Sequence, residues 1–306
     1  MNKTIPAHIA LFTLNLLYAI SYFVIKSVTP EFLGANGFVL VRASGALCLF
    51  WLFGSLMPKE KIDKSDFKKF IVAALFGVVF NQLSFFNGMP YTSPNYSAII
   101  MTSTPIIVLI ISAIYLKEEI TRNKVIGMFL GGLGAVTIIL QNKITQDAPN
   151  PILGNLLIFS NAANFGFYIV YCKPLMEKYN PLTVLKWVFL FGSIILFPIG
   201  ISDIQEASWN FPTEIWIGIV YVIVGITFLT FLLNMYAIKR VSPNIATTYI
   251  FLQPFLSAIL SFIIKGRLMD IWSITASILI FIGVYFVSFK KEKSNQISQD
   301  ILDKTD

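Results

Sequence analysis

Ten apolar runs of about 20 residues follow one another along the chain, and each can cross the roughly 30 Å hydrocarbon layer of a membrane. Backbone groups in lipid must satisfy their own hydrogen bonds, so such runs form helices or closed barrels. The alternation of apolar and polar residues that a barrel strand needs is missing. We therefore predict an all-α polytopic membrane protein with ten transmembrane helices near residues 6–26, 35–56, 69–88, 95–116, 123–141, 152–172, 182–200, 214–236, 244–264 and 271–289.

The charges lie mainly between these runs and predict the orientation of the chain. Only 13% of the 306 residues are charged, about half the share in soluble domains. With both termini in the cytoplasm, about 17 basic residues fall on the cytoplasmic side and about four on the other. The opposite loops also hold Asp203 and Glu206. This scatter argues against nucleic-acid binding and predicts a multi-pass protein of the cytoplasmic membrane, with residues 291–306 as a disordered cytoplasmic tail.

One phrase occurs twice. "SPNYSAIIMTSTP" spans residues 93–105 and "SPNIATTYIFLQP" spans residues 242–254, 149 positions later. Nearly the same shift lays the first five runs on the last five, which predicts two repeats over residues 5–141 and 152–290. Because five crossings is an odd number, the second repeat must be inverted relative to the first. Inverted repeats are typical of secondary transporters, whose substrate site lies near the midplane between the halves.

The second proline of each phrase falls near the middle of its predicted helix. Proline lacks a backbone N–H and leaves the carbonyl four residues earlier without its helical donor, so the helix bends there. We expect each bend to line a pathway; the alternative is that the bends only shape the bundle. The candidate pathway residues in these two stretches are Thr102, Thr104, Pro105, Tyr249, Gln253 and Pro254.

Polar residues also recur on one face of several other predicted helices, mostly at spacings of three and four residues. Such a face suits lipid poorly and should turn inward. There it can form interhelical hydrogen bonds or line a water-filled cavity, and the set as a whole favours a cavity. The candidates are Asn15, Tyr18 and Tyr22; Asn81, Gln82 and Phe85; Asn161, Asn164 and Tyr168; and Thr227, Thr230 and Asn234.

Two basic residues lie within predicted spans, and no Asp or Glu does. Lys186 is close enough to the cytoplasmic end of its span to extend its ammonium group to the surface. Arg42 is deeper, where a charge is expensive. It could hold a substrate carboxylate or phosphate with its two-pronged guanidinium group, or donate to carbonyls at helix ends. Both interpretations of Arg42 are open at this point.

Four features spread over residues 5–290 form a recognisable set: "LLYAISYFVIK", Arg42, "NGMPYTSPNYSAIIMTSTPIIVLIISAIYLKEEIT" and "GMFLGGLGAV". With these features the sequence resembles the EamA-type transporters of the drug/metabolite transporter superfamily. Glu118 matches the first residue of an acidic motif after the fourth helix of that family, whereas Arg267 stands at the equivalent place in the second half. Tyr18 and Ala19 replace a frequent Trp-Gly pair. The resemblance implies a metabolite carrier, frequently an exporter, with ten helices in two inverted bundles.

These observations together predict a secondary transporter that moves a small organic metabolite, such as an amino acid, by alternating access. The alternatives are a membrane channel and a non-transporting membrane scaffold. We expect no enzyme, cofactor or metal, because one terminal histidine and no intramembrane carboxylate leave no catalytic set. The expected partners are the substrate and the lipid bilayer. Four glycines at 127, 131, 132 and 134 allow close helix packing, either within the chain or in a homodimer.

Overall fold

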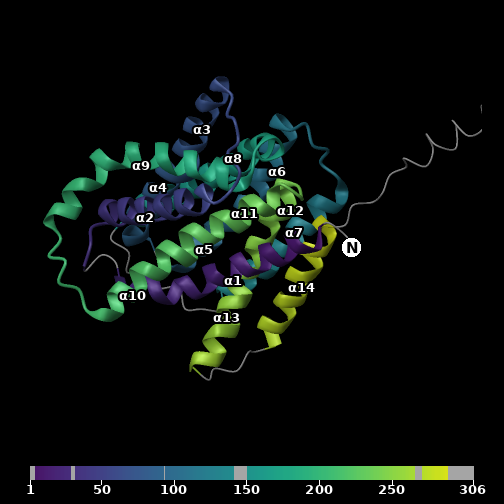
Figure 1. Ribbon diagram of the computed structural model, residues 1–306. Helices are drawn as coiled ribbons and strands as arrows, with labels where there is room; N and C mark the ends of the chain where they lie inside the picture. Colours follow the sequence, from purple (N-terminus) through teal and green to yellow (C-terminus); the bar gives the residue numbers. More distant parts are fainter. Residues whose placement is uncertain (1–3, 29–31, 93, 141–149, 266–270, 289–306) are drawn as a thin grey trace, which may run out of the picture.

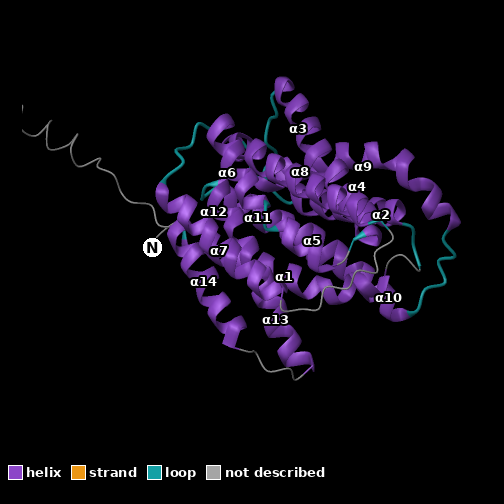
Figure 2. Ribbon diagram, turned by 180° about the vertical axis from the view of Figure 1, so that it is seen from behind, coloured by secondary structure: helices purple, strands orange, loops and turns teal. Residues whose placement is uncertain are grey.

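The computed structural model describes residues 4–28, 32–92, 94–140, 150–265 and 271–288. These residues form helices joined by loops, with no strand among them (Figure 2). The first half of the chain contains α1 Ile5–Val28, α2 Ala35–Ser55, η1 Lys64–Asp66, α3 Phe67–Ala74, η2 Leu75–Phe80, α4 Asn81–Gly88, η3 Met89–Tyr91, α5 Pro94–Met101, α6 Thr104–Tyr115 and α7 Arg122–Leu140.

The second half contains α8 Pro151–Lys178, α9 Pro181–Glu206, α10 Thr213–Tyr221, η4 Val222–Leu229, α11 Thr230–Ile238, α12 Pro243–Thr248, η5 Tyr249–Phe251, α13 Leu252–Lys265 and α14 Ile271–Ser288. Helical segments thus cover each predicted apolar run. Within the described ranges, six helices are long and apolar enough to cross a membrane: Ala35–Ser55, Lys64–Tyr91, Ser97–Tyr115, Pro151–Lys178, Pro181–Glu206 and Thr213–Ile238. Two shorter apolar helices cover Ile5–Ile20 and Ile274–Ser288.

Several helices of the second half begin in the same way, with a polar residue followed by proline. The Asn150 side chain accepts a hydrogen bond from Leu153 N at 3.2 Å at the start of α8. At the starts of α9 and α12, Asn180 and Ser242 accept bonds from backbone N–H groups in the same manner. Proline fits the first helical turn because the N–H it lacks would have no helical partner there. These local signals fix where the second-half helices start.

Both proline stretches interrupt their helices. α5 ends at Met101, and α6 begins at Thr104, directly before Pro105. In the second half, α12 ends at Thr248, and the 3₁₀ turn η5 separates it from α13, which carries Pro254. The missing proline N–H explains why regular α-helical bonding stops at each place. The two interruptions lie at matching positions of the repeated phrase.

A second pair of irregular segments was not expected from the sequence. η2 and η4 are π-helical and divide the long helices Lys64–Tyr91 and Thr213–Ile238. They also lie about 149 positions apart, the spacing of the repeated phrase. In η4 the hydroxyl of Thr227 donates to the Val222 carbonyl five residues earlier, at 2.9 Å. π-helical turns are rare and concentrate at functional sites.

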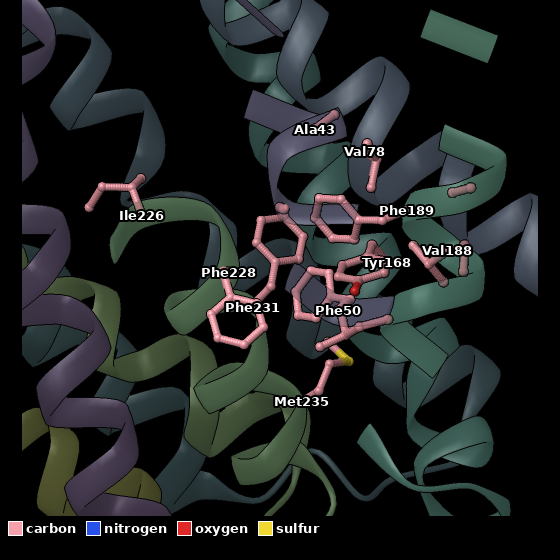
Figure 3. Packing of buried hydrophobic residues seen from close by; sticks show 14 of the residues in the cluster. Ala43, Phe50, Val78, Tyr168, Val188, Phe189, Ile226, Phe228, Phe231 and Met235 are labelled. Atoms are coloured by element: carbon pink, nitrogen blue, oxygen red, sulfur yellow. The ribbon is translucent and has the colours of Figure 1, made fainter. Parts of the chain in front are cut away.

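Helices from the two halves pack on one another throughout the bundle. α2 lies along α9, and α7 lies along α14 (Figure 1). α8 of the second half packs on α4 and α6 of the first half. In the corresponding way, α1 of the first half packs on α11 and α13 of the second half. The largest apolar cluster joins α2, α8, α9 and η4–α11, where the rings of Phe50, Phe189 and Phe231 gather around the centre of Figure 3. Phe50 lies 4.9 Å from Phe189, centroid to centroid, within the range of favourable ring contacts.

The placement of Asp203 and Glu206 in a loop is wrong. α9 continues beyond the predicted end of its run and contains both residues, and Asp203 Oδ2 accepts a hydrogen bond from Gly37 N at 2.9 Å. Gly37 lies in the first turn of α2, whose N–H groups have no partners within the helix. The carboxylate therefore caps α2 and joins the start of α2 to the last turns of α9.

Glycines of α7 lie in close contact with other helices of the same chain. A Cβ on Gly134 would lie 2.5 Å from the Ala276 carbonyl oxygen, and one on Gly127 would lie 2.6 Å from that of Gly283. Both carbonyls belong to α14, so the absent side chains let the two backbones touch. These contacts leave the homodimer untested, and it stays a prediction.

We expect Gly134→Ala to destabilise the folded protein by about 1–3 kcal/mol, because the added methyl group forces α7 away from α14. Gly132→Ala is the matched control, since its Cβ would meet Phe251 at 3.8 Å, an ordinary contact. Thermal unfolding of both variants in detergent measures the effect. Equal melting temperatures for the two variants would contradict the packing described here.

Candidate functional site

Arg42 is the buried charge at the centre of the candidate site. It lies on α2 with 6% of its surface exposed. Its Nε donates to the Thr227 hydroxyl at 3.1 Å, and Thr227 belongs to the π-helical segment η4. A residue of the first half is therefore held by an irregular segment of the second. The terminal nitrogens of the guanidinium group make no hydrogen bond to the described residues.

The guanidinium group of Arg42 also lies over an aromatic ring of α4. Its Cζ is 5.1 Å from the ring centroid of Phe86, which packs edge-on against Phe38 and Phe85, each at 5.3 Å. Gln82 precedes Phe86 by one helical turn and shares its face of α4. Gln82 is 3% exposed, and neither its amide nitrogen nor its amide oxygen has a hydrogen-bond partner.

Tyr18 connects α1 to the same part of the second half. Its hydroxyl accepts a hydrogen bond from Thr230 Oγ1 at 3.1 Å. Tyr221, just before η4, donates to the Leu17 carbonyl at 3.0 Å. Both α1 and α2 are thus bonded to the segment that runs from α10 through η4 to α11. The sequence-predicted residues Tyr18, Arg42, Thr227 and Thr230 lie together at this junction.

Asn81 and Asn161 lie at a different place and have their amide donors satisfied. Asn161 Nδ2 donates to the Asn81 carbonyl at 2.8 Å, and Asn81 Nδ2 returns a bond to the Asn161 carbonyl at 3.2 Å. Asn164 donates to Ser160, which faces Ser84 of α4. These bonds join α4 to α8 in the way expected of helix packing. Of the two alternatives given for polar helix faces, interhelical hydrogen bonding describes the contacts of Asn81 and Asn161.

Asn15 forms part of a third polar group, between α1 and the start of α13. Its Oδ1 accepts from Gln253 Nε2 at 2.9 Å, and its Nδ2 donates to the Leu11 carbonyl at 2.7 Å. Nearby, Tyr249 of η5 shares a 2.8 Å hydrogen bond with His8 Nδ1. Pro254 follows Gln253 on α13 and is half-buried. The group therefore holds α1 beside the interruption of the second half.

At the proline interruption of the first half, between α5 and α6, some buried hydroxyl groups lack a hydrogen-bond partner. Thr102 Oγ1 donates to the Ile99 carbonyl at 2.6 Å, which satisfies its hydroxyl locally. Thr104 is fully buried beside Pro105, and its hydroxyl has no hydrogen-bond partner; the same is true of Ser103 Oγ. A buried hydroxyl without a partner is costly. These two hydroxyls are the buried side-chain groups of the described residues at this bend that have no partner.

Three predicted site residues do not join these groups. Tyr168 is 1% exposed and lies in the apolar cluster of Figure 3, with its ring 6.0 Å from that of Phe231. Asn234 is buried on α11, and its Oδ1 has no partner. The side chain of Tyr22 lies outside the described residues. Lys186 lies near the start of α9, with its ammonium group 5.0 Å from the ring of Trp51.

The contacts of Phe86 and Glu118 were not predicted from the sequence. Phe86 was missed, although its position four residues after Gln82 placed it on the same helix face. Glu118, expected only from the family resemblance, accepts from Lys124 Nζ at 2.9 Å and from Asn244 Nδ2 at 2.8 Å. Asn244 is the asparagine of the second Ser-Pro-Asn phrase, so this carboxylate links the two halves at the end predicted to be cytoplasmic.

The ion pairs of the described residues lie at helix ends. They join Lys69 and Lys178 to Asp66, Lys178 to Asp63, and Lys124 to Glu118, and none includes Arg42. The described residues also contain no group of three His, Cys, Asp or Glu side chains that could hold a metal ion. The groups at the central junction, where Arg42 meets η4, are therefore one cation, hydroxyls, an amide and aromatic rings. Such groups suit the binding of a ligand.

The family model described as "EamA-like transporter family" matches residues 5–140 and 152–289. A Bacillus subtilis protein named "Uncharacterized transporter YyaM" is 26% identical over 280 residues, covering 90% of this chain and 88% of that protein. An "Uncharacterized transporter" of Archaeoglobus fulgidus is 27% identical, covering 76% of this chain and 81% of that protein. "Protein WALLS ARE THIN 1" of Arabidopsis thaliana is 23% identical over 97% of this chain and 86% of its own length.

A crystal structure of another protein has a TM-score of 0.76 and 16% identity, over 92% of this chain and 98% of that one. This likeness bears on the fold alone. The family match covers two long segments that together make up most of the 306 residues, and these segments meet at the junction around Arg42. The protein is a multi-pass membrane protein that belongs to the EamA-like transporter family.

Proposed function

We propose that the protein is a secondary transporter that moves a small organic metabolite, such as an amino acid, across the cytoplasmic membrane by alternating access. The observation that carries the proposal is the recurrence of two kinds of irregular segment at matching positions of the halves. Each half has a proline interruption and a π-helical segment, and the π segment of the second half contacts Arg42. Irregular backbone at membrane depth is tolerated where it lines a cavity or meets a polar partner.

The proposed architecture is ten transmembrane helices in two inverted repeats, residues 5–141 and 152–290, followed by the cytoplasmic tail 291–306. The helix pairs support it, because they come in sets related by exchange of the halves. Exchanging the halves carries the α4–α8 contact onto α11–α1 and the α6–α8 contact onto α13–α1, and it leaves α2–α9 and α7–α14 unchanged. Such pairing is expected of two inverted repeats that pack around a shared axis.

The described bonds between the halves suit a structure that must change its conformation. At the central junction they are single hydrogen bonds, Arg42 to Thr227 and Thr230 to Tyr18. Each such bond is worth about 1 kcal/mol within a bundle, so a few can break without unfolding a helix. At the proposed cytoplasmic end, Glu118 and Asn244 form a further bond that must open when that side admits solute. Export is the direction that the family resemblance implies.

A channel is the alternative that a polar junction also allows. The burial of Arg42 and Gln82 favours a carrier, because both side chains are closed off from solvent in this conformation. A scaffold needs neither a buried cation nor buried amide groups without partners. The transporter family and the absence of a nucleophile motif together support a binding and transport role over catalysis.

Saturable counterflow is the expected behaviour of the purified protein in proteoliposomes. Vesicles preloaded with a panel of unlabelled metabolites should accumulate the corresponding radiolabelled solute transiently, because exchange through one alternating site couples the two fluxes. Protein-free vesicles are the control. Flux that rises linearly with solute concentration and shows no counterflow would instead identify a channel.

The proposed topology predicts opposite labelling of two introduced cysteines. Gln146→Cys, in the segment between the two repeats, should react with a membrane-impermeant maleimide in intact cells. Ser298→Cys, in the C-terminal tail, should react only after lysis. Both should be made with Cys48 and Cys172 replaced by serine or alanine, and the variant lacking cysteine is the background control. Labelling of both positions from the same side would rule out an odd number of crossings between them.

A further inference from the structure

The central junction contains a cation without a counter-ion. Arg42 is 94% buried, and no carboxylate of the described residues lies within ion-pair distance of it. It donates to the Thr227 hydroxyl, lies over the ring of Phe86 and interacts electrostatically with Tyr18, and none of these three is a carboxylate. A buried charge normally has a partner of opposite sign, and one inside a membrane protein marks a functional site by default. An anion supplied from outside the chain would complete this arrangement.

The contacts of Arg42 fix its orientation and leave its binding face available. Thr227 holds Nε, and the Phe86 ring centroid lies 5.1 Å from Cζ. The two terminal nitrogens make no hydrogen bond to the described residues. A guanidinium group binds a carboxylate through two parallel hydrogen bonds, and loses little freedom when its side chain is already held. The group that best matches this arrangement is therefore a carboxylate.

Gln82 supplies a second, independent observation. It is 97% buried, and both polar atoms of its amide lack partners, although burial of an unsatisfied amide opposes folding. It lies one turn of α4, about 5 Å, from Phe86, and so on the side of the helix that meets Arg42. An amide can donate to a carboxylate or accept from an ammonium or hydroxyl group of the same ligand.

We propose that Arg42 and Gln82 form a subsite for the carboxylate of an amphipathic organic acid or amino acid. The inference rests on the proposed function and narrows its substrate class. The carboxylate bonds to the terminal nitrogens of Arg42, and the amide of Gln82 bonds to a polar group of the ligand. The hydrocarbon part of the ligand lies against Phe85 and Phe86, whose rings are in edge contact with each other. In the conformation described here the subsite is closed to solvent.

The first experiment compares acids with their amides. The melting temperature of the full chain in detergent is measured against rising concentrations of phenylacetate and L-phenylalanine, and of phenylacetamide and L-phenylalaninamide. At least one of the two acids should raise the melting temperature in a saturable way, and its amide should not. Stabilisation by phenylacetate assigns an organic acid, and stabilisation by L-phenylalanine alone assigns an amino acid. If neither acid stabilises the protein, or the amides do so equally, the inference is overturned.

The second experiment removes the charge. Arg42→Gln should raise the half-saturating concentration of the stabilising acid at least about tenfold, the order expected for loss of a charge-assisted pair. Arg240→Gln is the matched control, because Arg240 is exposed and its guanidinium group stacks on Tyr236 at 3.6 Å. An unchanged half-saturating concentration in Arg42→Gln, or an equal loss in Arg240→Gln, would remove the role assigned to Arg42.

Gln82→Leu provides a test that does not depend on the folding of Arg42→Gln. Leucine fills most of the volume of Gln82 without burying an unsatisfied amide, so the ligand-free variant should melt at a higher temperature than the native protein. Its half-saturating concentration for the acid should rise several-fold. A lower melting temperature combined with unchanged binding would show that Gln82 is a packing residue.

Transport separates the failure of this inference from the failure of the proposed function. Saturable counterflow of a neutral solute that persists in Arg42→Gln would leave the transporter intact and remove the carboxylate subsite. If the native protein shows no counterflow of any solute in the panel, the proposed function itself fails. Counterflow of an acid that is lost in Arg42→Gln and retained in Arg240→Gln supports both.

Discussion

Every backbone N–H and C=O within a membrane must find its partner in the protein, and the structure follows from this requirement. It excludes open strands and makes the long apolar runs helical. It also makes each departure from regular helical bonding informative, since the groups released there need another partner. Among the described residues, two kinds of departure lie in matched pairs, the proline interruptions and the π-helical segments. One of the polar contacts between the halves is made by the π-helical segment of the second half, where Thr227 meets Arg42.

Hydrophobic packing holds some helix pairs of the bundle together, and hydrogen bonds hold others. The aromatic cluster around Phe50 and Phe189 holds α2, α9 and α11 together without directional bonds. Reciprocal amides at Asn81 and Asn161 fix α4 on α8. Between these firmly packed regions, Arg42 and Gln82 lack the partners that their burial calls for. A transporter requires this combination, because it must keep its halves intact and leave binding groups free for a solute.

The sequence is sufficient to predict the all-helical class, the boundaries of most apolar runs and the position of both proline interruptions. The sequence pattern groups Asn81 and Gln82 as neighbouring candidates, but it cannot predict which of them forms a hydrogen bond to another helix. In the structure the amide nitrogen of Asn81 bonds to α8, whereas the amide of Gln82 has no hydrogen-bond partner. The π-helical segments escape prediction because nearly all their residues, Thr227 apart, are apolar or glycine, and only tertiary contacts decide where the extra residue is accommodated. Asp203 was misplaced for a related reason, since its partner Gly37 is far away in sequence.

The π-helical segment η4 has a mechanical consequence. A π turn accommodates one residue more than an α turn, so relaxing it to α-helix would rotate the helix beyond it by roughly 100°. Thr227 lies within this segment and Thr230 directly after it, and they bond to helices α2 and α1 respectively. A single shift in helical register would therefore turn both hydroxyls away together and break both of these hydrogen bonds in one step.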